Sequence, residues 1–262
     1  MVSVLPILER KLVRDLRQIA GQAAAIVLVV ACAVATADMS FGVLRSLEQA
    51  RAQFYERCRF ADLFGSLRRA PEAAAEAIRR LPGVAALQTR LAADVAIGLA
   101  GTDEPIAGRL LSLPERGEPE VNAIVLRRGR LFSAADAPEV IVSERFAEAH
   151  GLAPGERLSV RLRGHSRELV IVGLALSPEY VYALGPGMIA PDDRRFGILW
   201  AGRRLLEAEL GAGGEFNDLA VRVKESAALE EVAHQVEAAL KAYGAADIHG
   251  RERQPSHAFL SA

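Results

Sequence analysis

The feature that most constrains this chain is an unbroken run of 20 uncharged residues from Gln18 to Ala37. An α-helix needs about 20 apolar residues to cross the roughly 30 Å hydrocarbon core of a membrane. Backbone polar groups cannot stay unpaired in lipid, and a helix pairs all of its own. The run is therefore predicted to span a membrane as a helix.

The charges on the two sides of this run favour one orientation. Four basic residues precede it: Arg10, Lys11, Arg14 and Arg17. Three follow it in residues 38–57: Arg45, Arg51 and Arg57. Because Lys and Arg are enriched on the cytoplasmic side of membrane proteins, we expect a cytoplasmic N-terminus and an extracytoplasmic chain after about residue 38.

The apolar run has three other interpretations. A cleaved signal peptide has an apolar region of about 7–15 residues and a short basic start, whereas this run is longer and follows 17 residues. Residues Val29–Cys32 would serve as a lipobox, but the sequence stays apolar for five residues beyond Cys32. The third interpretation is a buried core helix, which a run this long and apolar on all sides disfavours. We expect a retained anchor, and whether Cys32 is a lipidation site stays open.

The residues on either side of the run also have helical spacing. In the lead, residues 1–17, leucines recur at intervals of three and four, which is typical of an amphipathic helix. Such a helix could lie along the inner leaflet, and an ordinary solvated helix remains the alternative. After the run, apolar residues continue at helical spacing to Arg59. Residues 18–59 are therefore predicted to form the transmembrane helix and a stalk.

Two distant parts of the remaining chain each have a β-α-β pattern. The first consists of a strand at 59–67, a helix at 71–81 and one or two strands at 84–99. The second has a strand at 218–223, a helix that Ser226 caps and Gly244 ends, and a strand reaching about Gly250. Together they suggest a ferredoxin-like split βαβ subdomain of the porter type, residues 60–100 and 186–262.

Between these parts lies a stretch of short strands separated by turn residues. The expected strands cover residues 105–113, 123–128, 140–142, 158–162 and 169–176. A short helix at 144–150 is closed by Gly151, and Gly164-His165 is expected to reverse a hairpin. We predict a β-rich inserted subdomain at 101–185, and the fold class is therefore α+β.

The composition and motifs exclude several functions. With 32 Lys+Arg against 33 Asp+Glu and 5% aromatics, no nucleic-acid surface is expected. Two cysteines, Cys32 and Cys58, exclude a disulfide framework or a Cys-based zinc site, and the five histidines lack metal-like spacing. The chain has no phosphate-binding loop, no complete dinucleotide fingerprint and no Gly-x-Ser-x-Gly elbow. We therefore expect no enzyme, name no catalytic, cofactor or metal residue, and leave the substrate-binding residues unknown.

Several motifs, taken in order along the chain, resemble a known family. They are Lys11-Leu-Val-Arg-Asp-Leu-Arg, Gly21-Gln22, Gly129-Arg-Leu-Phe, Glu139-Val-Ile-Val-Ser-Glu-Arg-Phe-Ala, Gly151-Leu-Ala-Pro-Gly-Glu-Arg-Leu, Leu169-Val-Ile-Val-Gly-Leu-Ala-Leu-Ser-Pro-Glu-Tyr-Val-Tyr, Pro191-Asp-Asp-Arg-Arg-Phe-Gly-Ile-Leu-Trp and Phe216-Asn-Asp-Leu. Each motif alone is weak, but the ordered set is similar to FtsX/MacB-type ABC transporter permeases over nearly the whole chain.

This resemblance implies an architecture. Such permeases have a first membrane helix, a large extracytoplasmic domain with a porter part and a β-rich part, and three further helices. The present sequence is expected to be a C-terminally truncated fragment, since those later helices are missing. Its location would be the bacterial inner (plasma) membrane, in a single pass.

The resemblance also implies a function. The chain would be the membrane-anchored extracytoplasmic portion of a permease subunit, which couples ATP hydrolysis by a partner ATPase to export or extraction of a substrate. Residues 18–59 would transmit the motion. Expected partners are an ABC-type ATPase subunit, a second permease copy or repeat, membrane lipid, and a periplasmic adaptor or lipoprotein. The alternatives are an FtsX-like module that controls cell-wall hydrolases and an anchored ligand-binding lipoprotein.

Overall fold

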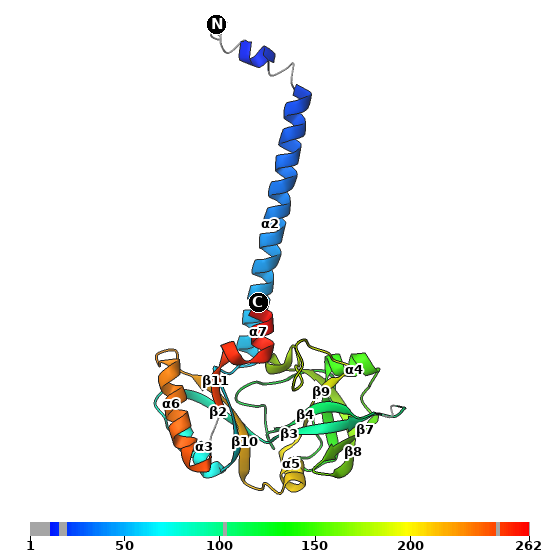
Figure 1. The fold of residues 1–262 in the computed structure, drawn as a ribbon, viewed down its shortest axis with the longest axis vertical. Helices are drawn as coiled ribbons and strands as arrows, with labels where there is room; N and C mark the ends of the chain where they lie inside the picture. The colour runs from blue at the N-terminus through cyan, green and yellow to red at the C-terminus, as the bar shows by residue number, and fades with distance from the viewer. Residues whose placement is uncertain (1–10, 16–19, 102–103, 245–246, 262) are drawn as a thin grey trace. The chain divides into compact units, whose positions relative to one another are not determined.

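The structure is a computed structural model that describes residues 11–15, 20–101, 104–244 and 247–261 (Figure 1). The chain divides into two units, Met1–Gln53 and Phe54–Ala262. In the predicted amphipathic lead, residues 11–15 are helical. The rest of that lead, residues 1–10 and 16–17, lies outside the described residues.

Helix α2 (Ala20–Arg57) is 38 residues long and contains both the apolar run and the predicted stalk. Its apolar side chains, such as Val29 and Val34, are exposed. Exposure of apolar side chains all round a helix suits a lipid environment. By length and composition, α2 is the one helix among the described residues that could cross a membrane.

The second unit has a four-stranded sheet with the order β11-β1-β10-β2, in which all neighbouring strands are antiparallel. The strands are β1 (Leu63–Pro71), β2 (Val84–Arg90), β10 (Glu215–Val223) and β11 (Asp247–Gly250). Helix α3 (Glu72–Arg79) connects β1 to β2, and α6 (Leu229–Leu240) connects β10 to β11. The two β-α-β units therefore meet in one sheet, although residues 91–214 separate them.

Helices α3 and α6 cover one face of this sheet (Figure 1). Each presents buried apolar residues at helical spacing, Ala74 and Ile78 in α3 and Val232 and Val236 in α6. Neither helix could bury its apolar face in its own β-α-β unit alone, so the shared core joins the units. The predicted Ser226 cap is wrong: Ala228 is the N-cap, because a turn at residues 224–227 delays the helix.

The second sheet has the order β5-β8-β6-β9-β4-β3-β7, and β8 also pairs with β7. Its strands are β3 (Ala92–Gly98), β4 (Ile106–Leu113), β5 (Val125–Gly129), β6 (Glu139–Ser143), β7 (Arg157–Leu162), β8 (His165–Leu176) and β9 (Phe196–Gly202). Because β8 pairs with both β6 and β7, the sheet closes into a small barrel, with β5 attached outside the circle. Apolar side chains fill the interior, as in other small barrels.

This sheet extends beyond the predicted insertion of residues 101–185 at both ends. Strand β3 follows β2 after one residue, Leu91, yet pairs with β4 of the barrel. Strand β9, which the sequence analysis missed, pairs with β4 and β6. Its fully buried apolar run, Phe196–Gly202, was the available signal. A short strand does not encode which sheet it joins, so these boundaries could not be placed from local pattern.

The remaining elements are short and connect or flank the sheets. The predicted helix α4 (Glu144–His150) is confirmed, and Gly151 closes it in a left-handed conformation. Helix α5 (Arg203–Leu210) follows β9. The others are the 3₁₀ helices η1 (Pro178–Tyr180), η2 (Lys241–Tyr243) and η3 (Arg251–Arg253), and helix α7 (Pro255–Ser261).

Gly202, between β9 and α5, offers a test of this packing. A Cβ at this position would lie 2.2 Å from the Ala135 backbone oxygen, which also accepts a hydrogen bond from the Leu205 amide. We expect Gly202→Ala to destabilise the domain by about 1–3 kcal/mol through overpacking. Gly213→Ala, where a Cβ meets nothing within 4 Å, is the matched control and should be neutral or slightly stabilising. Thermal unfolding of the full chain in detergent would compare the two, and equal stability would contradict the packing at Ala135.

Candidate functional site

A cluster of buried charged side chains lies where the two sheets of the second unit meet. Arg90, at the end of β2, donates hydrogen bonds from Nη1 and Nη2 to the two carboxylate oxygens of Glu179 in η1, both at 2.6 Å. Its Nε donates to Asp218, which is paired with Arg90 across β10 and β2. These three side chains are at most 8% exposed. We call them, with Asn122 and Arg109, the junction cluster.

Asn122 and Arg109 extend the cluster toward neighbouring segments. The Asn122 Nδ2 donates to Glu179 Oε2 at 2.9 Å, while its Oδ1 accepts a hydrogen bond from the Ala61 amide at 2.8 Å. Arg109, on β4 of the barrel, donates from Nη2 to Asp218 Oδ2 at 3.3 Å. The cluster therefore joins β2 and β10 of the four-stranded sheet to β4 and η1, which belong to the barrel side.

The charges in the junction cluster balance, with two arginines against two carboxylates. Burial alone would raise the pKa of Glu179, but the charge of Arg90 and its hydrogen bonds outweigh burial and lower that pKa. Burial likewise opposes the charge on Arg90, and Asp218 and Glu179 raise its pKa above the ordinary value. Glu179, Arg90 and Arg109 therefore stay ionised at neutral pH, and each charge is stabilised by an opposite charge beside it.

The segment 251–257, which we call the C-terminal segment, is bonded to both sides of this junction. Arg251 donates to the backbone oxygens of Phe60 and Ala61 at 2.9 and 2.7 Å. Gln254 donates from Nε2 to the backbone oxygen of Glu179, and the Tyr182 amide donates to Ser256 Oγ at 3.1 Å. The segment thus connects the start of β1 to η1.

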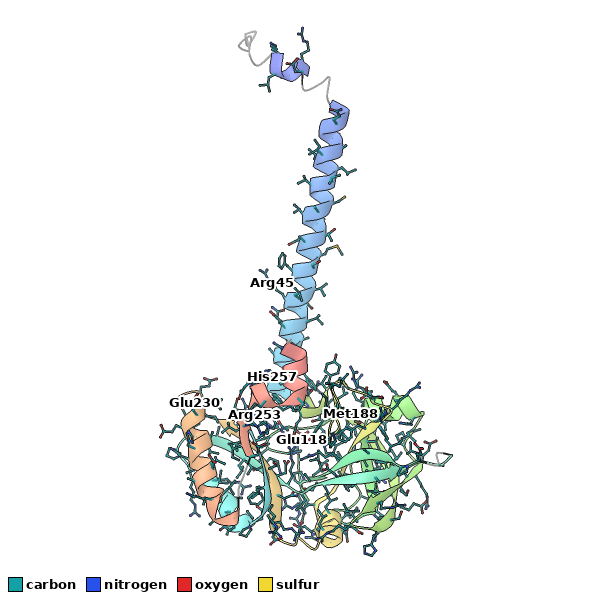
Figure 2. All side chains as sticks on the ribbon, in the orientation of Figure 1. Arg45, Glu118, Met188, Glu230, Arg253 and His257 are labelled. Carbon is teal, nitrogen blue, oxygen red and sulfur yellow. The ribbon has the colours of Figure 1, made fainter. Side chains whose placement is uncertain are left out.

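The last turn of α2 meets the same segment. Tyr55 Oη and His257 Nδ1 lie 3.2 Å apart, and the ring of Tyr55 stacks on that of Phe60 with centroids 4.3 Å apart. Figure 2 shows His257 on α7 and Arg253 on the preceding η3. The end of α2 and the start of α7 therefore lie side by side. The residues next to each are hydrogen-bonded to the junction cluster, Ala61 to Asn122 and Gln254 to Glu179.

The chemistry of this site suits mechanical connection. In the junction cluster both carboxylates bind arginines in a buried environment. Within the described ranges, no group of three His, Cys, Asp or Glu side chains could hold a metal ion. Cys58 is 1% exposed, and burial raises the pKa of its thiol against the opposing charges of Arg57 and Arg59. A raised thiol pKa disfavours the nucleophilic thiolate.

The junction cluster is not apparent from the sequence pattern, although two of its residues lie in motifs that resemble the permease family. Glu179 lies in Ser177-Pro-Glu-Tyr and Asp218 in Phe216-Asn-Asp-Leu. The available signal was Asp218 directly before the apolar residues 219–221, because a charge in a buried strand needs a partner. The partner, Arg90, is 89 and 128 residues away in sequence, so only the fold brings the three together.

Comparison with known proteins adds a match that covers most of the chain. A family model described as the MacB-like periplasmic core domain matches residues 19–239. The extracellular domain of the ABC-type transporter YknZ from Gram-positive bacteria aligns with a TM-score of 0.47 and 12% identity, over 72% of this chain and 99% of that chain. The periplasmic region of MacB from Actinobacillus actinomycetemcomitans aligns with a TM-score of 0.47 and 10% identity, over 77% and 94%. No curated protein matches the chain. Both TM-scores are below 0.5, so the family is inferred from the family model alone.

The junction cluster generates a prediction about stability. Glu179→Gln leaves the buried Arg90 with one carboxylate, so we expect a loss of about 3 kcal/mol at pH 7. Glu118→Gln removes an exposed ion pair to Arg59 (3.3 Å) and should cost less than about 1 kcal/mol.

Because the folded pKa of Glu179 is lowered, its contribution to the free energy of unfolding is complete above the unfolded pKa of about 4.3 and is lost as pH falls through the folded pKa. Denaturant unfolding from pH 7 to 3 measures this. A constant difference between wild type and Glu179→Gln across that range would contradict the ion pair.

Proposed function

Because the chain belongs to the MacB-like periplasmic core domain family of FtsX/MacB-type ABC transporter permeases, we propose that it is the membrane-anchored extracytoplasmic portion of a permease subunit. In this proposal a partner ATPase binds and hydrolyses ATP, the membrane helices move, and the external domain shifts to export or extract a substrate. Such coupling is a population shift between conformations that a remote ligand drives.

The observation that carries this proposal is the convergence of α2 and the C-terminal segment on the junction cluster. Tyr55, in the last turn of α2, contacts His257, and Gln254 of the same segment binds Glu179. A displacement of α2 along or across its axis would therefore act on both sheets through short, bonded contacts. Side chains that are buried and ion-paired have little freedom to move independently, so they transmit such a displacement.

A second bonded position supports movement of the two sheets as one body. Arg203 of α5 binds Glu72 of α3 at 2.6 Å and also donates to the Glu215 backbone oxygen at 2.7 Å. Arg69 of β1 donates to the backbone oxygen of Leu210, at the end of α5, at 2.7 Å. With contacts at this position and at the junction cluster, rotation of one sheet against the other would break buried hydrogen bonds.

We further propose that the four-stranded sheet with α3 and α6 is a ferredoxin-like porter subdomain into which the barrel is inserted. Its order β11-β1-β10-β2, its antiparallel neighbours and the helix after β1 and after β10 support this description. The barrel, β3 to β9, occupies the connection between β2 and β10. The expected partners are an ABC-type ATPase and a second permease copy or repeat.

The orientation of the chain is tested with an impermeant thiol reagent. Ser166, exposed in β8 next to the hairpin turn, accepts cysteine without the left-handed backbone of Gly164. In a Cys32→Ser background, Ser166→Cys should react in intact spheroplasts, since the domain lies outside the cytoplasm in this proposal. Ser3→Cys, in the same background, should react only after the membrane is permeabilised. If Ser166→Cys did not react in intact spheroplasts, the domain would lie in the cytoplasm, and the proposed extracytoplasmic role would be wrong.

The coupling role is tested with two neighbouring arginines in η3. Arg251 binds Phe60, Ala61 and Asp62, whereas Arg253 is 63% exposed and pairs with Asp247 on the surface. With the full-length permease and its partner ATPase in nanodiscs, we expect Arg251→Gln to reduce substrate-stimulated ATP hydrolysis by about fivefold or more, with complex formation preserved. Arg253→Gln should stay near wild type. Equal stimulation in both variants would show that the C-terminal segment does not relay motion.

A further inference from the structure

A cavity of about 510 Å³ lies on the side of the barrel next to the end of α2. We call it the lateral cavity. Its walls are the loop of residues 114–119, the start of β5 and the segment of residues 131–135, and it begins at Arg57, the last residue of α2. Its lining includes Arg57, Glu115, Glu118, Ile124, Leu131 and Phe132.

Most of the residues that line the cavity are apolar. Ile124 and Phe132 pack against a buried apolar cluster that includes Ile198 and Trp200 and is separate from the barrel interior, so the wall is continuous with hydrophobic core. Leu131 is 49% exposed at the cavity, although a leucine of this size is usually covered. A partly enclosed apolar cavity of this size falls within the roughly 300–1,000 Å³ of small-molecule sites.

The rim of the cavity carries one uncompensated positive charge. Its two carboxylates are paired, Glu115 with Arg204 at 2.9 Å and Glu118 with Arg59 at 3.3 Å. Arg57 forms no ion pair with any residue in the described part of the chain. An unpaired guanidinium beside an apolar cavity is complementary to a carboxylate or phosphate attached to an apolar group.

The wall that contains Leu131 is held in place without a ligand. Glu139 accepts hydrogen bonds from Arg130 Nη2 and from the Ser133 amide, both at 2.7 Å. The hydrogen bond from Arg130 is the main cause that lowers the pKa of Glu139 to about 2, so the carboxylate remains ionised at neutral pH. A wall that is already ordered loses little conformational entropy when a ligand binds.

We propose that the lateral cavity binds a single-chain amphipathic anion. Its apolar chain lies against Ile124, Leu131 and Phe132, and its acidic headgroup is placed at Arg57. The volume, in the lower half of the usual range, suits one chain better than a two-chain phospholipid. Because the headgroup contact is the last residue of α2, binding there could bias the position of that helix. This role rests on the proposed function and names a ligand class for it.

The test uses photo-crosslinking of the full chain in phosphatidylcholine nanodiscs. The probes are a diazirine-bearing dodecanoic acid and the matching alcohol, and adducts are mapped by mass spectrometry. We expect the acid to label peptides from residues 113–135. Arg57→Gln should reduce this labelling by about tenfold, as loss of one charge-assisted contact predicts. The alcohol should label weakly and equally in both proteins. Arg116→Gln, an exposed arginine of the same loop outside the cavity lining, should match wild type.

A second pair of variants tests the apolar wall. Leu131→Asp places a carboxylate at the cavity and should abolish labelling by the acid, whereas Ile189→Asp, at a 96% exposed apolar residue elsewhere, should not. Thermal unfolding establishes that each variant is folded. Adducts confined to residues 20–37, or acid labelling that is insensitive to both Arg57→Gln and Leu131→Asp, would overturn the proposal. Nanodiscs need neither the ATPase nor a cellular orientation, so failure of the proposed function would leave this result unchanged.

Discussion

The pairing of Arg90 with Glu179 and Asp218 is the interaction on which the second unit depends. All three side chains are nearly inaccessible to water, and an unpaired charge in such a place would cost several kcal/mol. Each of the three comes from a different segment, β2, η1 and β10, so the charges are satisfied only when the sheets meet in one arrangement. The ion pairs therefore specify that arrangement rather than merely adding stability to it.

The same cluster explains how the connections to the rest of the chain are organised. The last turn of α2 and the C-terminal segment contact each other through Tyr55 and His257, and Gln254 binds the backbone of Glu179. A permease of this family would need its external domain to respond to movement of its membrane helices. Contacts of this kind would let the response reach both sheets, and Arg203 at α5 would keep the sheets from separating as they move.

One short stretch of the chain, residues 57–61, contacts both the lateral cavity and the junction cluster. Arg57 lines the cavity, while Phe60 and Ala61, a few residues later, accept hydrogen bonds from Arg251. Cys58 and Arg59 between them contribute backbone oxygens to the amides of Ala123 and Asn122. A ligand at Arg57 would therefore bind next to the residues that connect α2 to the junction, which gives a physical route from ligand binding to helix movement.

Local sequence pattern by itself determined many of the helices and strands of this protein, although not β9. The uncharged run that begins at Gln18 predicted α2, and helical spacing with Gly151 predicted α4, because hydrophobic period and capping act over a few residues. Tertiary structure decided which sheet each strand joins: β3 and β9 enter the barrel, and the pairing of β3 with β7 closes it. It alone also brought Arg90 to Glu179 and Asp218, and Arg57 to the walls of the lateral cavity. Strand pairing and ion pairing connect residues about one hundred positions apart, and no local period records such partners.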